Sequence, residues 1–299
     1  MESLARTWLA ALAAVAALTG CATSAPTQPT ALRLDCATSQ AQVPNAVYIG
    51  RYAGVENVIP LNEMAHDLHC PDAFKAANFP RGYVTLYGSS RIRENNAACG
   101  PGGADCNEAL KAANDTLYAQ VRRFSFAWTQ RHGGRFPIMS GAGPGLMEAA
   151  NRGAKEAGGA SIGYTTYYDR TAAGSPARPY GGDPRLALSP YVTHGLIFSS
   201  VALREHAMIK HSAAMVVAPG GTGTEWELFQ IIETLKSSQL TKVPVYLLGN
   251  RSVHWRSFEA RLQDMVDRRT VGKDEVAFVK FAENDEELMK RLAADLGLD

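Results

Sequence analysis

Short apolar runs alternate with longer amphipathic segments over most of the chain. The apolar runs, bounded by glycine, proline or serine, predict strands at residues 83–87, 136–139, 160–166, 196–198, 213–218, 243–248 and 276–279. Apolar residues spaced three or four positions apart predict helices at residues 107–131, 146–157, 201–211, 228–235, 254–268 and 285–296. This alternation, with short connections, predicts an α/β fold: a doubly wound, mostly parallel sheet with helices on both faces.

Polar and glycine-rich turns follow three of the expected strands. They are residues 88–90 (Gly-Ser-Ser), 140–145 (Ser-Gly-Ala-Gly-Pro-Gly) and 219–224 (Pro-Gly-Gly-Thr-Gly-Thr). Ligands of parallel sheets bind outside the carboxyl ends of the strands, so one cleft is expected to gather these turns. A segment rich in proline, glycine and tyrosine, residues 167–195, interrupts the alternation, and loops of this length are usually functional or mobile.

The turn at residues 219–224 joins an expected strand to the start of an expected helix. In that arrangement several backbone N–H groups point at one spot where the helix dipole favours an anion, so a phosphate fits there. The candidate substrate and phosphate contacts from the three turns are Gly88, Ser89, Gly141, Gly143, Gly145, Gly220, Gly221, Thr222, Gly223 and Thr224.

Arg204 and Glu227 are the candidate catalytic residues, a cation and a carboxylate that flank the turn at 219–224 in sequence. Arg204 shares a helix face with Val201 and Met208, and an arginine on such a face needs an acceptor. A structural ion pair with Glu227 is the alternative reading. Glu227 also completes a capping-box pattern with Thr224, which would give it a purely helical role.

The turn at residues 140–145 resembles a dinucleotide fingerprint, but its spacing is Gly-x-Gly-x-Gly rather than Gly-x-Gly-x-x-Gly. NAD binding by an oxidoreductase is therefore the weaker interpretation. A purely structural alternative is that these glycines let a helix pack closely against a strand. Residues 66–70, His-Asp-Leu-His-Cys, give the one hint of metal-ligand spacing, but no second ligand pair accompanies them, so a structural role is favoured.

Residues 1–20 have the features of a signal peptide: Arg6, then an apolar stretch of 11 residues from Trp8 to Leu18, too short to span a bilayer. Residues 18–21, Leu-Thr-Gly-Cys, resemble a bacterial lipobox, which implies cleavage before Cys21 and its acylation. A signal peptide with an incidental cysteine is the alternative. We expect a lipidated tether over residues 21–45, one domain over residues 46–299, and an outer-membrane lipoprotein facing the periplasm.

Four cysteines remain besides Cys21, in a compartment that permits disulfides. Of the three possible pairings we favour Cys99 with Cys106 and Cys36 with Cys70, because the first pair brackets a short glycine-rich segment. Four buried thiols are the alternative. The chain carries 30 basic and 29 acidic residues with no basic run, which argues against nucleic acid as a partner.

These motifs together resemble the LONELY GUY (LOG) family of cytokinin riboside 5'-monophosphate phosphoribohydrolases, often labelled lysine decarboxylases. Residues 219–227 fit the family pattern Pro-Gly-Gly-x-Gly-Thr-x-x-Glu, and Arg204 stands at the place of the family's arginine. The resemblance covers about residues 80–250. It implies a Rossmann-like fold, a homodimer, and hydrolysis of the N-glycosidic bond of a nucleotide such as AMP, with Arg204 and Glu227 catalytic and without a metal or redox cofactor.

The chain departs from the family pattern at three positions. The family's Arg-Lys dipeptide is Arg204-Glu205, Glu233 stands where a threonine is usual, and Ala142 replaces a glycine. The loss of a cation beside Arg204 puts the substrate in question more than the fold. A nucleotide-binding lipoprotein that has lost turnover is therefore the second functional hypothesis.

Overall fold

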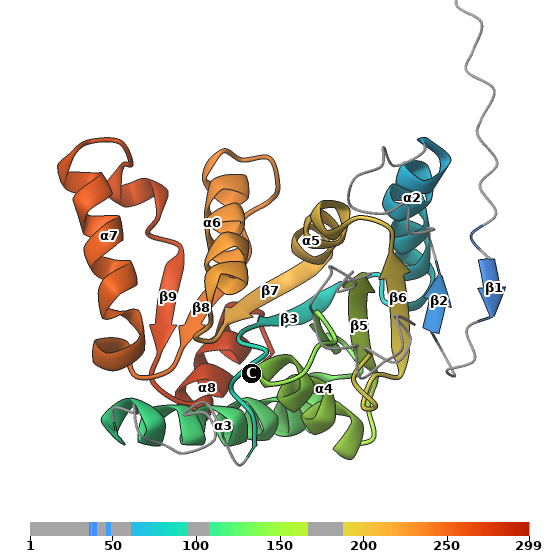
Figure 1. Ribbon diagram of the computed structural model, residues 1–299, viewed down its shortest axis with the longest axis horizontal. Coiled ribbons are helices and arrows are strands. Elements are labelled where there is room, and N and C mark those ends of the chain that lie inside the picture. The colour runs from blue at the N-terminus through green and yellow to red at the C-terminus, as the bar shows by residue number, and fades with distance from the viewer. Residues whose placement is uncertain are drawn as a thin grey trace, which may run out of the picture. The chain divides into compact units, whose positions relative to one another are not determined.

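The computed structural model describes Cys36, Thr38–Gln40, Ala46–Tyr48 and residues 61–94, 108–166 and 188–298. These residues belong to one compact unit. Its centre is a nine-stranded sheet of order β1-β2-β6-β5-β4-β3-β7-β8-β9 (Figure 1). The strands are β1 (Thr38–Gln40), β2 (Ala46–Tyr48), β3 (Tyr83–Tyr87), β4 (Ile138–Ser140), β5 (Ser161–Thr166), β6 (His194–Phe198), β7 (Ser212–Val217), β8 (Val245–Leu248) and β9 (Val279–Ala282).

The helices that connect these strands are α2 (Leu61–Asn78), α3 (Glu108–His132), α4 (Leu146–Glu156), α5 (Val201–Lys210), α6 (Thr222–Lys236), α7 (Arg256–Asp267) and α8 (Asp285–Asp295). Neighbouring strands from β2 to β9 pair in parallel, and β1 pairs antiparallel with β2 at the edge. The predicted α/β fold with a mostly parallel sheet is confirmed.

Alternation along the central strands builds a separate core on each face of the sheet. On β3, Val84 and Leu86 join one buried cluster, whereas Tyr83 and Tyr87 join the other. Helices α3, α4 and α8 cover the first face, and α2, α5, α6 and α7 cover the second (Figure 1). Successive residues of a strand point to opposite faces, so each strand must be apolar throughout, which explains the uninterrupted apolar runs.

Two elements differ from the sequence predictions. Helix α2 was not predicted: it buries Asp67, Cys70 and Pro71, so its inward face has no apolar stripe to detect. The strand predicted at residues 276–279 exists but is displaced by three residues: a 3₁₀ turn at Lys273–Glu275 comes first, and β9 begins at Val279. Strand β9 lies at the edge of the sheet and is only partly buried, so fewer of its positions must be apolar.

The folded unit reaches into the segment predicted to be a tether. Strand β1 pairs with β2, and Cys36 forms a disulfide with Cys70 of α2, the pairing favoured from the sequence. A three-residue edge strand has too little pattern to be recognised, so the boundary at residue 45 was placed too late. The signal peptide, Cys21, Cys99 and Cys106 lie outside the described residues. Among the described helices, none has the length and apolar character needed to cross a membrane.

Candidate functional site

The three predicted turns meet at the carboxyl ends of the adjacent strands β4, β3 and β7. The Ser89 N–H donates to the Pro219 carbonyl at 3.2 Å, and the Leu146 N–H donates to the Ser89 carbonyl at 2.9 Å. Gly145 has a φ of 74°, and a Cβ there would collide with the backbone of Ser89 and Ser90. The turn after β3 therefore holds the other two turns together through backbone contacts.

Helix α6 begins at Thr222, with Gly221 as its N-cap and no side-chain cap. The amides of its first turn have no intrahelical acceptors, and the exposed residues Gly220, Gly221, Thr222 and Gly223 leave them accessible. The capping-box alternative is wrong, because Thr224 already lies inside the helix and Glu227 lies in its second turn. The geometry leaves an anion-binding helix start with Glu227 free for another role.

Arg204 and Glu227 lie in contact, as one site requires. Arg204 Nη2 of α5 lies 3.4 Å from Glu227 Oε1 of α6. A second carboxylate, that of Glu205, also forms an ion pair with Arg204 Nη2. The side chains of Arg204, Glu205 and Glu227 are 5%, 1% and 12% exposed, and we call these three residues the buried cluster.

The start of helix α5 is fixed by a buried carboxylate from α2. Asp67 accepts hydrogen bonds from the Ser199 N–H at 3.0 Å, the Ser199 hydroxyl at 2.7 Å and the Ser200 N–H at 3.0 Å. Burial raises the pKa of Asp67, although the hydrogen bonds from Ser199 and Ser200 oppose this. Ser200 is the N-cap of α5, so Asp67 sets where the helix that carries Arg204 begins. No pattern around Asp67 in the sequence indicates this contact.

Burial raises the pKa of Glu227 to about 7, against the opposing effect of the Arg204 charge. Tyr87, at the end of β3, interacts with the same charges. Burial raises the pKa of its hydroxyl well above the ordinary value; the Glu227 charge raises it further, and the Arg204 charge lowers it. Tyr87 was not among the predicted residues, because in the sequence it reads as one more apolar position of a strand.

Gly141 brings the turn after β4 against the buried cluster. A Cβ at this position would lie 3.4 Å from Arg204 Nη1 and 2.9 Å from Met147 Sδ, so a larger residue would displace one of them. A Cβ at Gly143 would likewise press on Met147, and Gly88 packs against Leu146 and Ala218. A side chain at Gly141 would thus contact Arg204, whereas Gly88 and Gly143 have packing roles.

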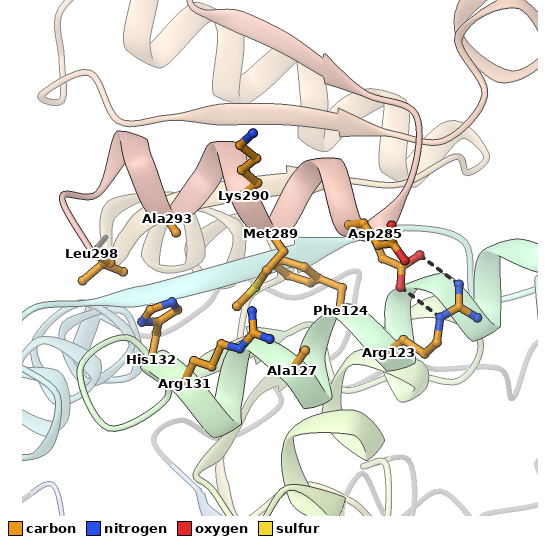
Figure 2. Close-up of a pocket in the computed structure, with 11 residues that line it drawn as sticks. Arg123, Phe124, Ala127, Arg131, His132, Asp285, Met289, Lys290, Ala293 and Leu298 are labelled. Carbon is orange, nitrogen blue, oxygen red and sulfur yellow. Dashed lines mark hydrogen bonds and ion pairs between the residues drawn. The ribbon is translucent and has the colours of Figure 1, made fainter.

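A separate pocket of about 510 Å³ lies between α3 and α8, and it contains none of the predicted site residues (Figure 2). Phe124 and Met289 meet at its centre, and Arg123 points at Asp285 with hydrogen bonds of 2.9 and 2.8 Å. Both apolar side chains are buried, so the pocket offers a ligand little apolar surface. Within the described residues, no group of three or more histidine, cysteine or acidic side chains could hold a metal ion.

One comparison with known proteins agrees with the motif. A family model described as possible lysine decarboxylase matches residues 147–292. No curated protein matches the chain. The molybdenum cofactor binding protein of the phototrophic bacterium Rippkaea orientalis has 16% identity over 71% of this chain and 96% of its own, with a TM-score of 0.45. The molybdenum cofactor carrier protein of Chlamydomonas reinhardtii has 19% identity over 72% and 98%, with a TM-score of 0.44.

The region matched by the family model contains Arg204, Glu227 and the start of α6. These are the parts of the site that the sequence motif singled out and that the structure brings into contact. The match to the family described as possible lysine decarboxylase covers residues 147–292, and the chain resembles the LOG-like proteins of that family over this region.

Proposed function

We propose that this protein hydrolyses the N-glycosidic bond of a nucleoside 5'-monophosphate, of the AMP or cytokinin riboside monophosphate type, to a free base and ribose 5-phosphate. The observation that carries the proposal is the contact between Arg204 and Glu227 beside the N-terminus of α6. A phosphate on the first-turn amides of α6 would be held by Gly220, Gly221, Gly223 and Thr224.

Glu227 lies five residues after Thr222, which is about 7.5 Å further along the axis of α6. At that distance the carboxylate serves the sugar rather than the phosphate, from which it would be repelled. Breaking the glycosidic bond places positive charge on the ribose, and a fixed carboxylate stabilises that charge. Glu227 therefore acts on the ribose or the attacking water, and Arg204 orients the leaving base.

The test uses the full-length protein in detergent micelles with AMP, GMP, CMP and UMP, and measures the free base by chromatography. Adenosine serves as the substrate control, because it lacks the phosphate that α6 would bind. Glu225→Gln is the matched variant: Glu225 lies in the first turn of α6, about 200° around the axis from Glu227. Release from nucleotides, lost in Glu227→Gln and kept in Glu225→Gln, supports the proposal. No release from any nucleotide overturns it.

A second candidate function is nucleotide binding without turnover, and the ion pair between Glu205 and Arg204 favours it. A guanidinium held by a neighbouring carboxylate is less available to a leaving base. Saturable binding of AMP in calorimetry, with no free base after prolonged incubation, would favour this binding protein over the hydrolase.

The envelope location and the homodimer are proposals that depend on the sequence alone. Acylation of Cys21 is tested by labelling cells with a radioactive fatty acid, with Cys21→Ser as the control. Light scattering of the detergent-solubilised protein tests the dimer.

A further inference from the structure

The buried cluster does not contain equal numbers of positive and negative groups. One guanidinium, that of Arg204, faces the carboxylates of Glu205 and Glu227. His206 and Lys210, the other basic side chains of α5, are exposed, and Lys210 pairs with Asp72 at 2.6 Å. With both carboxylates ionised, the three described side chains of the cluster carry one net negative charge.

Glu205 makes this imbalance more costly. It is 1% exposed, and neither of its carboxylate oxygens accepts a hydrogen bond of ordinary geometry from the described residues, although one oxygen touches Arg204. A buried charge without full compensation is strongly unfavourable in a low-dielectric environment. The cluster therefore needs either a bound proton or a cationic group supplied by a ligand.

Near neutral pH, a ligand cation can replace the proton bound by Glu227. Burial raises the pKa of Glu227 to about 7, so at neutral pH the protonated and ionised forms are both populated. Tyr87, whose hydroxyl interacts with the Glu227 charge, stays neutral, since burial raises the pKa of that hydroxyl well above the ordinary value. A ligand cation placed beside Glu205 and Glu227 would take the place of that proton.

We propose that the substrate is a nucleoside 5'-monophosphate whose base carries a fixed positive charge, such as a pyridinium or an N-alkylated purine. This inference rests on the proposed hydrolysis of a nucleoside 5'-monophosphate, and it replaces the neutral base of the AMP type by a cationic one. The two ends of such a nucleotide have opposite charges, and so do the two ends of the site. The start of α6 favours the phosphate, and the buried cluster favours the cationic base.

The chemistry of the bond also suits a cationic base. When the bond between C1' and the ring nitrogen breaks, its electron pair passes to that nitrogen and cancels the positive charge. The base leaves as a neutral molecule, water forms the new bond to C1', and one water proton is released. A neutral base would leave as an anion unless a group protonated it. The cationic base needs no such proton donor.

The experiment compares nicotinamide mononucleotide, which has a pyridinium base, with AMP, using the full-length protein in detergent micelles. The readout is the ratio of the two kcat/KM values, from chromatography of the released bases. In the wild type we expect the pyridinium nucleotide to be favoured at least about tenfold, the effect of a modest charge interaction. In Glu205→Gln, which keeps the size of the side chain but removes one charge, we expect the ratio to fall about tenfold.

Glu233→Gln is the control, because Glu233 is 64% exposed on α6 and pairs with Lys236. Its ratio should equal that of the wild type. Release from AMP with none from nicotinamide mononucleotide overturns the inference and leaves the proposed function standing. An unchanged ratio in Glu205→Gln also overturns the inference. Release from neither of these nucleotides, nor from GMP, CMP or UMP, overturns the proposed function itself.

Discussion

Two clusters in this protein both consist of arginine and glutamate, but one has balanced charges and the other has an excess of negative charge. The surface cluster consists of Arg122, Arg152, Glu94 and Glu156, with ion-pair distances of 2.5 to 3.2 Å. Its charges balance, and its side chains are 21% to 45% exposed. The buried cluster has one arginine for two glutamates and is almost without solvent.

The pKa values record the difference. Hydrogen bonds from Arg122 hold the pKa of Glu156 below its usual value, because they stabilise the ionised form. Burial raises the pKa of Glu227 to about 7, because the loss of solvent disfavours the ionised form more than the Arg204 charge favours it. The charges of the surface cluster balance one another, whereas the buried cluster has an excess negative charge that a cationic ligand would neutralise. Imbalance together with burial distinguishes a candidate site from a surface network.

Removal of the arginine should show the largest difference in stability effect between the two clusters. Arg204→Met leaves two carboxylates buried without a counter-charge, and we expect it to lower the free energy of unfolding by about 3 to 5 kcal/mol. Arg122→Met should cost less than about 1 kcal/mol, because water already solvates its partners. Urea denaturation of both variants measures this, and equal losses would mean that the buried cluster is not electrostatically distinct.

Glu227→Gln should affect activity more than stability. We expect base release from nucleotides to fall by about 100-fold, the usual effect of losing one electrostatic contact to the transition state. The free energy of unfolding should be unchanged or higher, because a neutral amide relieves the excess negative charge. Glu156→Gln in the surface cluster is the control and should release base at the wild-type rate. A Glu227→Gln variant within threefold of the wild type would remove Glu227 from the mechanism.

The sequence allowed most of the fold and the outline of the site to be predicted, for identifiable reasons. Strands buried on both faces are apolar throughout, so β3 and β7 were recognisable. The glycines at 220, 221 and 223 mark a turn into a helix start, and spacing alone predicted it. Arg204 stood out because a charge among Val201 and Met208 needs a partner, and its contact with Glu227 provides one.

The missed features depend on contacts between segments far apart in the chain. Asp67 caps α5 across 132 residues of sequence, and nothing around Asp67 indicates this. Helix α2 was missed because its buried residues, Asp67, Cys70 and Pro71, form no apolar stripe, and its attachment includes the disulfide from Cys36. The contact between Glu205 and Arg204 was also unforeseen: the sequence showed that a lysine was replaced, but not that the new carboxylate is buried against the arginine.

Stability should depend on pH in opposite directions at the two clusters. Glu227 has a pKa of about 7 in the folded protein and 4.5 as its ordinary value, so the folded state binds more protons between these limits. Its contribution is therefore present at low pH and lost as the pH rises from about 5 to 8, by about 2 kcal/mol. Glu156, with a lowered pKa, contributes above its ordinary value and loses that contribution in acid.

The measurement is the difference in unfolding free energy between the wild type and Glu227→Gln at pH 5, 6, 7 and 8. Taking this difference removes the effect of the histidines, which titrate in both proteins. The wild type should lose stability relative to the variant at each step. A constant difference over this range would show that Glu227 titrates with its ordinary pKa.

The smallest effect concerns salt. Glu94 is 45% exposed in the surface cluster, so Glu94→Gln should lower stability by about 0.5 kcal/mol at low salt and by almost nothing in 1 M NaCl, where exposed charges are screened. Glu205 is 1% exposed, so the effect of Glu205→Gln should be the same at both salt concentrations. Urea denaturation of each variant against the wild type supplies the four values. A salt-sensitive effect at Glu205 would mean that solvent reaches the carboxylate, and the excess charge would then need no ligand to match it.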